Sequence, residues 1–591
     1  MRHTEKILHL TLVGSGGDGV MSTASMLLRT AARMGLYGMM TQSYGPQIRG
    51  GESAAHVTIG VEPVAITGVV KDLIVCFRFE YLSRFAQEIT AAPHVALFHS
   101  AEETDIPVLL QTKEGMRVPI PFQQILEEAG LPEIAKNVVV FGMVLRALGW
   151  DLGDGNACVS EVFSHKSSAV ISSNLRALEV GYQHLETLTL PFRGPRHGAA
   201  KQTTVISGNE ACAEAAVDAG CRFYAGYPIT PSSEILEKVY ELFPAVGGRL
   251  VQAEDEIAAI GMIIGASWGG VKSMTATSGP GLSLMTEMLG LASMAEIPVV
   301  IVDCQRAGPA TGLPSRMEQS DLWHAIYGGH GDFPRVVLAP TNIRDCYLTM
   351  FRAFHLAETY QLPVLVLSDA NIAQRSEIIE KIDTRGFPRG ERAIAALETP
   401  GDIDALREGI YRRFDLAAAV DDRWPGVNPV AIPGMPGGMH SIAGIEHTER
   451  GTPSADGANH ERMNQKRFRK LMAIERETAE WCVTSGRAKA PIGLIAWGSC
   501  AGVVQEYALT RDDIALFVPH MLHPFPARAL QTFLEGRRTV GVIEMNFQGQ
   551  LYHHLRGIGV LDGTAHNLRR SGGLPFQLDE IGILLREGGL I

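Results

Sequence analysis

Short apolar runs alternate with segments of helical periodicity along most of the chain. Runs of strand length begin at Ile7, Pro298 and Pro363, and the residues of 20–34 repeat apolar positions at helical spacing. Strands that alternate with helices of about ten to fifteen residues are typical of parallel α/β sheets. We therefore predict an α/β protein with mainly parallel sheets and strands at Ile7–Val13, Arg222–Ala225, Pro298–Cys304, Arg335–Leu338, Pro363–Ser368, Ile492–Ala496 and Thr539–Ile543.

The same pattern divides the chain into three α/β domains, at residues 1–187, 205–376 and 490–591. The stretch between the first two, 188–204, is rich in proline, glycine and basic residues and lacks periodicity. Such a composition predicts a linker.

Regularity fades between residues 377 and 489. Proline and glycine are dense at 425–439, and 451–467 is polar and rich in turn-forming residues. We predict an irregular connecting arm that packs on a partner, because apolar residues persist in it; disorder is the alternative.

Composition and charge exclude several classes of protein. The chain has 591 residues, of which 46% are hydrophobic, and a net charge of −12, which argues against nucleic acid or an anionic membrane as the main partner. No apolar run approaches the roughly 18 residues of a membrane span. Glu5 and His9 interrupt the first apolar stretch, unlike a signal peptide. We expect a cytoplasmic protein.

The eight cysteines are scattered, with no C-x-x-C pair and no histidine at zinc-ligand spacing. We therefore expect no zinc ion or iron–sulfur cluster in this chain.

A glycine loop, GSGGDG at 14–19, follows the first strand and opens a helix, which suggests an anionic group at the helix N-terminus. A dinucleotide site also needs an acid about twenty residues on, and none occurs between Gly19 and Glu52. Arg49, in the second glycine-rich turn SYGPQIRGGES (43–53), could pair with an anionic ligand shared by both loops. The alternative is that these glycines only permit tight packing, and the charge of Asp18 favours it.

Four motifs lie in order in the central domain: GYPITPSSEI (226–235), QAEDEIAAIGMIIGAS (252–267), TATSGPGLSLMTE (275–287) and VDCQRAGPATGLPSRMEQSDL (302–322). Together they resemble the alpha subunit of 2-oxoacid:ferredoxin oxidoreductases, with the 2-oxoglutarate branch as the closest pattern. The two N-terminal glycine motifs resemble the gamma domain of that family, and IEMNFQGQL (543–551) resembles its transketolase C-terminal-like domain. The central domain would then be the thiamine diphosphate pyrimidine-binding domain.

The resemblance implies oxidative decarboxylation of a 2-oxoacid with coenzyme A (CoA), with thiamine diphosphate as cofactor and ferredoxin as electron acceptor. For 2-oxoglutarate the products are succinyl-CoA and CO2. Pyruvate, aryl glyoxylates and branched 2-oxoacids undergo similar chemistry and stay as alternatives. A nucleotide-dependent dehydrogenase and a non-catalytic nucleotide-binding subunit are the alternatives of other classes.

Thiamine chemistry requires a carboxyl group in an apolar pocket beside the aminopyrimidine. Glu256 shares a helical stripe with Ala259, Ile260 and Ile263, so it should be more buried than its neighbours Glu254 and Asp255. The resemblance also assigns it the catalytic role. The alternative is that all three acids only decorate a helix N-terminus.

The remaining site residues follow strands. Thr230 precedes Pro231 and could be a helix N-cap, while the family places the matching threonine near the substrate carboxylate. Arg306 follows the strand Pro298–Cys304, at the edge where open α/β sheets bind ligands, and matches the substrate-binding arginine of the family. A surface salt bridge is its alternative role. The cofactor residues implied by the match are Tyr227, Pro228, Ile229, Thr230, Glu256, Ser278 and Gly279.

The Mg²⁺ of this cofactor needs a Gly-Asp-Gly sequence followed by an asparagine ligand, and the triplets at 17–19 and 153–155 do not stand in that context. The diphosphate, the Mg²⁺ and a [4Fe–4S] cluster should therefore belong to a separate beta subunit. We expect a dimer of alpha–beta heterodimers.

A dicarboxylic substrate needs a second cation, since an unpaired buried carboxylate is costly. Arg316, ten residues after Arg306, is the nearest candidate in this chain. The alternatives are a solvated Arg316 paired with Glu318, and a second cation supplied by the partner subunit.

Overall fold

The computed structural model describes residues 3–45, 51–196, 198–199, 202–397, 411–417 and 424–591. They form two compact units, one of residues 1–207 and 374–382, the other of 208–373 and 383–591. Three sheets with mostly parallel strand pairs confirm the predicted α/β class. Among the described helices, none is long and apolar enough to cross a membrane.

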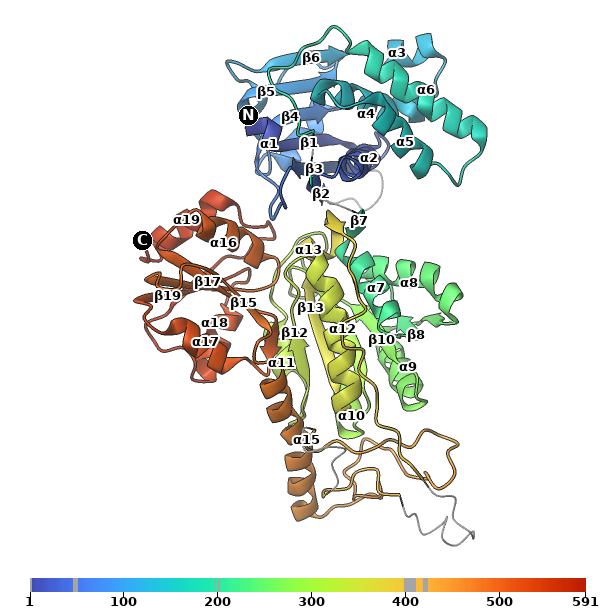
Figure 1. The fold of residues 1–591 in the computed structure, drawn as a ribbon, viewed down its shortest axis with the longest axis vertical. Coiled ribbons are helices and arrows are strands. Elements are labelled where there is room, and N and C mark those ends of the chain that lie inside the picture. Colours follow the sequence, from blue (N-terminus) through green and yellow to red (C-terminus); the bar gives the residue numbers. More distant parts are fainter. Residues whose placement is uncertain (1–2, 46–50, 197, 200–201, 398–410, 418–423) are drawn as a thin grey trace. The chain divides into compact units, whose positions relative to one another are not determined.

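The first unit contains an eight-stranded sheet in the order β6-β5-β4-β1-β3-β2-β14-β7 (Figure 1). Its strands are β1 (Ile7–Ser15), β2 (Tyr37–Tyr44), β3 (Glu52–Gly60), β4 (Val70–Cys76), β5 (Thr90–Ser100), β6 (Met116–Ile120), β7 (Thr203–Ser207) and β14 (Ser376–Glu380). β1 is parallel to β4 but antiparallel to β3, so this sheet is mixed.

Alternation along β1 sends Leu8, Leu10 and Leu12 to the face that the helices cover. The helices of this unit are α1 (His3–Lys6), α2 (Val20–Arg33), α3 (Phe122–Ala129), α4 (Lys136–Leu148), α5 (Leu152–Val162) and α6 (Ser168–His184), with 3₁₀ helices η1 (Phe79–Phe85), η2 (Val108–Leu110) and η3 (Glu133–Ala135). α2 begins at the predicted residue and ends one residue before the predicted Met34.

The segment predicted as a linker packs against this unit. Phe192 is buried in the core of the first sheet, and Trp150 Nε1 donates a hydrogen bond to Pro195 O at 2.7 Å. Residues 203–207 then form β7, which pairs with β14 rather than with the central sheet. A strand of the first unit thus includes residues 205–207, which the sequence pattern assigned to the central domain.

The central sheet has the order β18-β12-β13-β11-β10-β8-β9. Its strands are β8 (Phe223–Gly226), β9 (Arg249–Gln252), β10 (Ser273–Thr277), β11 (Val299–Gln305), β12 (Val336–Leu338), β13 (Pro363–Asp369) and β18 (Met521–His523). β18 is antiparallel to β12, and the others are parallel to their neighbours. β11 and β13 are buried along their whole length, as expected for parallel strands covered on both faces. The strands predicted at 222–225, 298–304, 335–338 and 363–368 are confirmed to within a residue at each end.

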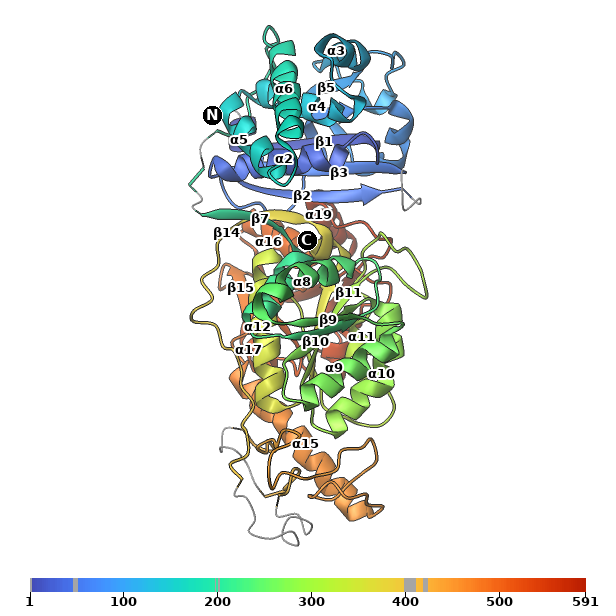
Figure 2. The same cartoon turned by 90° about the vertical axis from the view of Figure 1, so that its right-hand side faces the viewer.

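Helices cover both faces of this sheet (Figure 2). They are α7 (Gly208–Asp218), α8 (Ser233–Val246), α9 (Glu256–Trp268), α10 (Gly279–Met294), α11 (Leu322–Tyr327), α12 (Ile343–Tyr360) and α13 (Ala370–Gln374). Ile301 of β11 shares a core with Ile260 of α9 and Leu282 of α10, and α7 packs against α8 and α12.

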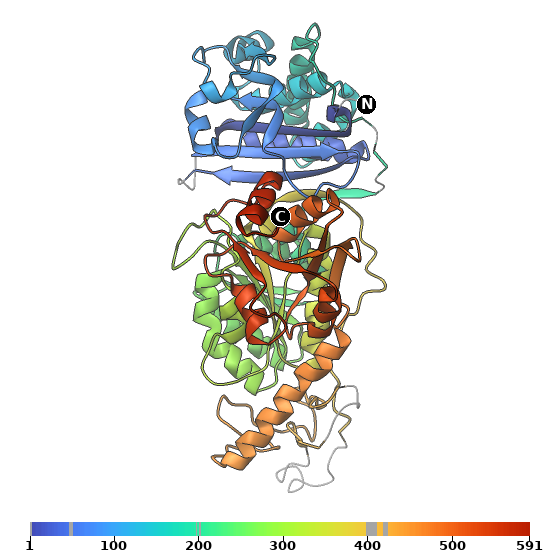
Figure 3. The same cartoon turned by 90° about the vertical axis from the view of Figure 1, so that its left-hand side faces the viewer.

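The C-terminal sheet, in the orange to red part of the chain in Figure 3, has the order β15-β17-β16-β19-β20. It consists of β15 (Cys482–Gly486), β16 (Ile492–Ala496), β17 (Ile514–Pro519), β19 (Thr539–Glu544) and β20 (His566–Arg569), with helices α16 (Cys500–Leu509), α17 (Ala527–Leu534), α18 (Gln550–Gly557) and α19 (Leu578–Glu587). β16 matches its predicted range, and β19 extends one residue further than predicted.

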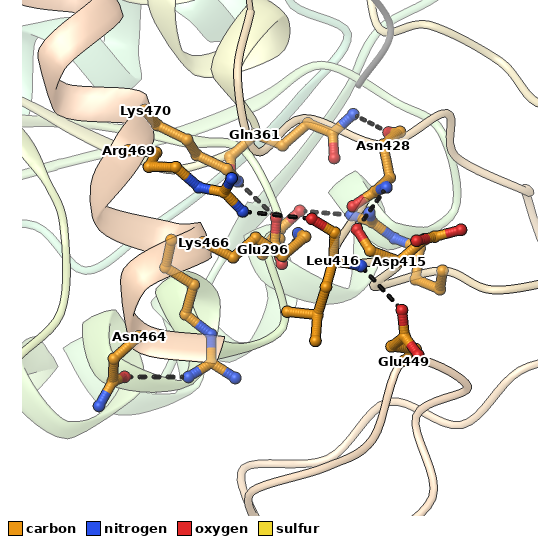
Figure 4. A network of polar contacts seen from close by, with 12 residues as sticks. Glu296, Gln361, Asp415, Leu416, Asn428, Glu449, Asn464, Lys466, Arg469 and Lys470 are labelled. Carbon is orange, nitrogen blue, oxygen red and sulfur yellow. Dashed lines mark hydrogen bonds and ion pairs between the residues drawn. The ribbon is translucent and has the colours of Figure 1, made fainter. Parts of the chain in front are cut away.

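The predicted irregular arm contains a long helix, α15 (Gly457–Glu477), so irregularity was wrong for these residues. Its inward face carries charge: Lys466 Nζ lies 2.5 Å and Lys470 Nζ 2.6 Å from the carboxylate oxygens of Glu296, and all three side chains are buried (Figure 4). Arg413 Nη2 also donates to Glu296 O at 2.8 Å. Burial alone would raise the pKa of Glu296, but the nearby cations lower it.

Candidate active site

Glu256 is the first residue of α9 and is buried, with 5% of its surface exposed. Asp255 is the N-cap of this helix, where its carboxylate accepts a hydrogen bond from Ala258 N at 2.7 Å. Asp255 and Glu254 are both exposed. The structure therefore confirms that Glu256 is the buried member of the three acids, because the helix turns it inward with Ala259 and Ile260.

The Glu256 carboxyl lies against the N-terminus of α10. A Cβ atom on Gly281 would lie 2.7 Å from Glu256 Oε1 and 2.0 Å from Thr277 Oγ1, so only glycine fits at this position. Ser278 is the N-cap residue of α10, and its Oγ atom is buried and makes no hydrogen bond within the described chain. The N-terminus of α10 thus has a buried carboxyl packed against it and a buried hydroxyl at its N-cap that is unpaired among the described residues.

The segment 227–231 leads from β8 towards α8. Tyr227, Pro228 and Thr230 are exposed and Ile229 is partly buried. The prediction that Thr230 is a helix N-cap was wrong. A turn follows it, in which Ser232 N donates a hydrogen bond to Ile229 O at 2.8 Å, and α8 begins only at Ser233.

Arg306 follows β11 directly and is 8% exposed, so it is not a surface salt-bridge residue. Its Nη1 atom donates a hydrogen bond to the backbone oxygen of Thr230 at 2.7 Å, which brings these two predicted site residues together. Burial lowers the pKa of the guanidinium, and the nearby Asp321 carboxyl opposes this shift.

Parallel pairing gathers these positions along one sheet edge. The 227–231 segment, Glu256, Ser278 and Arg306 follow the carboxyl ends of β8, β9, β10 and β11, which are neighbours in the sheet. This edge is where open α/β sheets bind ligands.

Two buried aspartates, Asp303 and Asp321, belong to the same edge, and neither was among the site residues predicted from the sequence. Their carboxyl groups are in hydrogen-bonding contact, and a Cβ atom on Gly279 would lie 2.7 Å from Asp321 Oδ2. Burial raises the pKa of both carboxyls. The signal was a lone acid, Asp303, inside the apolar run VVIVDCQ, since aspartate is almost never fully buried without a partner.

Asn209 of α7 supports the 227–231 segment, and the sequence analysis also missed it. It is 1% exposed, and its Nδ2 atom donates to Pro231 O at 2.7 Å and to Glu234 Oε2 at 3.0 Å. Burial raises the pKa of Glu234 to about 7. No motif at position 209 could have indicated this contact, because it depends on how α7 packs.

Arg316 lies in the loop after Arg306 and packs on a glycine of the C-terminal segment. A Cβ atom on Gly573 would lie 2.5 Å from Arg316 Cβ. Glu318 Oε1 accepts a hydrogen bond from Gly572 N at 3.1 Å. Residues 572–573 therefore fix the course of this loop.

In the first unit, the GSGGDG loop contains an acid, Asp18, whose charge is balanced by a nearby lysine. Asp18 lies 2.6 Å from Lys136 Nζ, and its carboxylate accepts hydrogen bonds at 2.8 Å from the backbone nitrogen and hydroxyl of Ser15. Burial would raise the pKa of Asp18, but these bonds outweigh it and lower it. Arg49 lies outside the described residues.

The donor set at the sheet edge fits an aminopyrimidine ring better than a metal ion. Within the described residues, no three His, Cys, Asp or Glu side chains cluster in a way that could hold a metal. The buried carboxyl of Glu256, and the buried hydroxyl of Ser278 that makes no hydrogen bond within the described chain, are both able to bond to the nitrogen atoms of such a ring.

Comparisons with known proteins show the family to which the chain belongs. Residues 214–405 match the family model described as "Pyruvate flavodoxin/ferredoxin oxidoreductase, thiamine diP-bdg", and residues 9–184 match "Pyruvate ferredoxin/flavodoxin oxidoreductase". The 2-oxoglutarate synthase subunit KorA of Methanothermobacter marburgensis is 36% identical over 388 residues, which are 64% of this chain and 96% of that protein. The chain belongs to the 2-oxoacid:ferredoxin oxidoreductase family. It is therefore an oxidoreductase subunit, and its central domain is of the thiamine diphosphate-binding type.

Several members of the 2-oxoacid:ferredoxin oxidoreductase family match nearly the whole chain. The alpha subunit of the 2-oxoacid:ferredoxin oxidoreductase of a Sulfolobus species is 29% identical over 626 residues, 96% of this chain and 95% of that protein. The solved 2-oxoglutarate:ferredoxin oxidoreductase from Magnetococcus marinus, with 2-oxoglutarate, coenzyme A and succinyl-CoA bound, is 34% identical with a TM-score of 0.89 over 99% of both chains. The arrangement of gamma-like and alpha-like parts in one chain is thus shared by other members.

Proposed function

We propose that the chain is the fused gamma–alpha subunit of an enzyme that oxidises 2-oxoglutarate with CoA to succinyl-CoA and CO2 and passes the electrons to ferredoxin. The observation that carries the proposal is the sheet edge at which Arg306 and Thr230 meet and to which Glu256 also belongs. The bound 2-oxoglutarate, CoA and succinyl-CoA of the Magnetococcus marinus enzyme support this choice of substrate.

Each residue of the edge has a role in this proposal. Arg306 would bind the 1-carboxylate of the substrate with the guanidinium atoms not used by Thr230 O, since its planar fork suits a carboxylate. The Thr230 hydroxyl would lie beside that carboxylate, and Glu256 would hold the aminopyrimidine through its carboxyl. The other residues proposed around the cofactor are Tyr227, Pro228, Ile229, Ser278 and Gly279. Thiamine diphosphate, when bound, supplies the carbon nucleophile and takes up the electron pair released with CO2.

The diphosphate, Mg²⁺ and a [4Fe–4S] cluster are assigned to a beta subunit, in a complex of two alpha–beta heterodimers with ferredoxin as acceptor. The isolated 591-residue chain should then be colourless, contain no iron and bind thiamine diphosphate weakly. Stoichiometric iron or tight cofactor binding without a partner would contradict this division.

We propose a gamma domain at 1–187, a linker at 188–204, a pyrimidine-binding domain at 205–376, a connecting arm at 377–489 and a transketolase C-terminal-like domain at 490–591, with residues 203–207 and 376–380 contributing β7 and β14 to the sheet of the first unit. We also propose that the protein is located in the cytoplasm. Limited proteolysis of the complex, with sequencing of the fragments, tests the limits.

Glu256→Gln in the reconstituted complex tests the proposed function. The variant should lose 2-oxoglutarate oxidation by about 10²–10⁴-fold while assembling normally, as for loss of an acid–base group. The matched control is Glu254→Gln, two residues away and exposed, which should keep its rate. Equal rates for both variants would overturn the assignment.

A further inference from the structure

Asp303 and Asp321 stand at the two ends of the loop that carries Arg306. Asp303 belongs to β11, three residues before Arg306, and Asp321 directly precedes α11. Asp303 is fully buried, and each carboxyl is the hydrogen-bonding partner of the other. The contact therefore joins the beginning and the end of the loop 306–320.

Other donors do not satisfy this pair. Both carboxylate oxygens of Asp303 and Oδ2 of Asp321 are buried and accept no hydrogen bond from an N–H or O–H group of the described chain. Asp321 occupies the N-cap position of α11, yet its side chain accepts no capping hydrogen bond. Aspartate at an N-cap ordinarily accepts one, as Asp255 does from Ala258 N. The Asp321 carboxyl is thus turned away from its own helix towards Asp303.

Two ionised carboxylates in buried contact repel each other strongly, so one proton between them is needed to hold them together. Buried Asp369 in β13 gives the contrast: its oxygens accept hydrogen bonds from Asn371 N, Ile372 N and Ser499 N at 3.0–3.1 Å. The Asp369 oxygens thus have three N–H donors, whereas those of Asp303 have none within the described chain.

A second link closes the same loop. Asp321 N donates to Gln305 Oε1 at 3.1 Å, and Gln305 Nε2 donates to Ser368 O at 3.0 Å. Arg306 is the next residue after Gln305, so its position depends on how the base of the loop is held.

Charged groups lie on several elements around the pair. Of these, Glu318 raises and Arg306 lowers the pKa of Asp321 by their charges. The charged or titratable groups on the elements around the pair include Cys304 of β11, Arg306, Arg316 and Glu318 of the loop, Glu256 of α9, Glu287 of α10, His324 and Tyr327 of α11, and Asp369 of β13.

We propose that Asp303 and Asp321 share one proton, and that this acid–carboxylate pair is a latch that closes the base of the loop 306–320 and holds Arg306 in its binding position. It rests on the proposed function only in taking Arg306 as the 2-oxoacid ligand. Burial raises the pKa of both carboxyls, so the pair as a whole keeps one proton at a pH at which a free aspartate has lost its own. The two aspartates are positioning residues.

The latch has a predictable dependence on pH. An unfolded aspartate releases its proton near pH 4, while the folded pair retains it to higher pH. Between about pH 4 and the higher pH at which the folded pair loses its proton, the folded chain therefore binds more protons than the unfolded chain. Its free energy of unfolding falls as the pH rises through this range. Loss of the shared proton opens the latch.

Thermal unfolding of the full-length chain between pH 5 and pH 8.5 tests the shared proton. Asp303→Asn replaces the acid by an amide that still donates to Asp321 but cannot ionise. The unfolding midpoint of the unchanged chain should fall as the pH rises from 5 to 8.5, and that of the variant should not fall with it. The midpoint of the variant minus that of the unchanged chain should therefore increase by at least about 2–4 °C over this range. Asp321→Asn should behave alike, because Asp303 then accepts. Asp369→Asn is the matched control and should lower the midpoint at every pH, since its amide faces N–H donors. A pH-independent difference for both isosteric variants would overturn the proposal.

The positioning role has its own readout in the reconstituted complex. Asp303→Leu removes the latch and should raise the KM for the 2-oxoacid about 10-fold more than Asp303→Asn does, with a smaller change in kcat. Equal KM values for the two variants would refute the positioning role. If the unchanged complex oxidises no 2-oxoacid, the proposed function fails, and the unfolding measurement still decides whether the proton is shared.

Discussion

The Nη1 atom of Arg306 donates a hydrogen bond of 2.7 Å to the backbone oxygen of Thr230, although 76 residues separate them. This bond joins the segment after β8 to the end of β11 and fixes the plane of the guanidinium. The Nε atom of Arg306 is buried and makes no hydrogen bond within the described chain. A buried cation with an unused donor is prepared to bind an anion.

Arg306→Lys should therefore impair substrate binding despite keeping the charge. A lysine ammonium cannot both bond to Thr230 O and present a planar fork to a carboxylate. The KM for the 2-oxoacid should rise by about 10–150-fold, equivalent to about 1.5–3 kcal/mol for a charged hydrogen bond. Steady-state kinetics check this, with exposed Arg344 of α12 as the control for Arg→Lys. An unchanged KM would remove Arg306 from the substrate site.

Arg316→Ala tests the choice of substrate within the proposed site. If Arg316 binds the distal carboxylate, the variant should lose about 1.5–3 kcal/mol in kcat/KM for 2-oxoglutarate and keep its value for pyruvate, which lacks that carboxylate. Equal losses on the two substrates would instead indicate a structural role, in which Arg316 holds the loop on Gly573.

We expect the two glycine-rich motifs, 14–19 and 43–53, to form part of the CoA site, with Arg49 pairing with the CoA phosphates, and Arg49→Ala tests this. A cation that pairs with the phosphates of CoA should, when removed, raise the KM for CoA and leave the KM for the 2-oxoacid unchanged. Exposed Arg117 of β6 offers a matched Arg→Ala control. If CoA dependence is unaltered, the two glycine-rich motifs have a packing role.

Glu296→Gln should destabilise the unit that contains α15. The substitution leaves Lys466 and Lys470 buried without a counter-charge, which ordinarily costs about 3–5 kcal/mol. Urea unfolding of the full chain checks this. Exposed Glu461 of the same helix is the control, and Glu461→Gln should change stability by no more than about 0.5 kcal/mol. Similar effects of both variants would contradict a central role for Glu296.

The sequence predicted those elements whose inward residues are apolar. The repeat of Leu8, Leu10 and Leu12 located β1, and the stripe of Ala259, Ile260 and Ile263 located α9 and the burial of Glu256. Helix α15 was not predicted, because its inward residues include Lys466 and Lys470. Their partner Glu296 lies 170 residues before Lys466 in the sequence. Hydrophobic periodicity cannot reveal a helix that packs through ion pairs.

The candidate site could be predicted only as far as its motifs reached. The end of the strand Pro298–Cys304 predicted Arg306 at the ligand-binding edge, while Glu256 and Ser278 came from the helical stripe and the motifs, and the structure has all three at one edge. The contact of Asp303 with Asp321 and the support from Asn209 could not be predicted, because they depend on side-chain packing between segments distant in sequence. Thr230 was misplaced as an N-cap because the turn that delays α8 has no signal beyond Pro231.

The most direct test of the proposed activity is the kcat/KM of the purified complex with 2-oxoglutarate and with pyruvate, measured as CoA-dependent reduction of ferredoxin. We predict that kcat/KM is at least about 10-fold higher for 2-oxoglutarate, because one charged hydrogen bond to its distal carboxylate contributes a free energy equivalent to about that factor. The product should be succinyl-CoA. A higher value for pyruvate would contradict the assignment to 2-oxoglutarate.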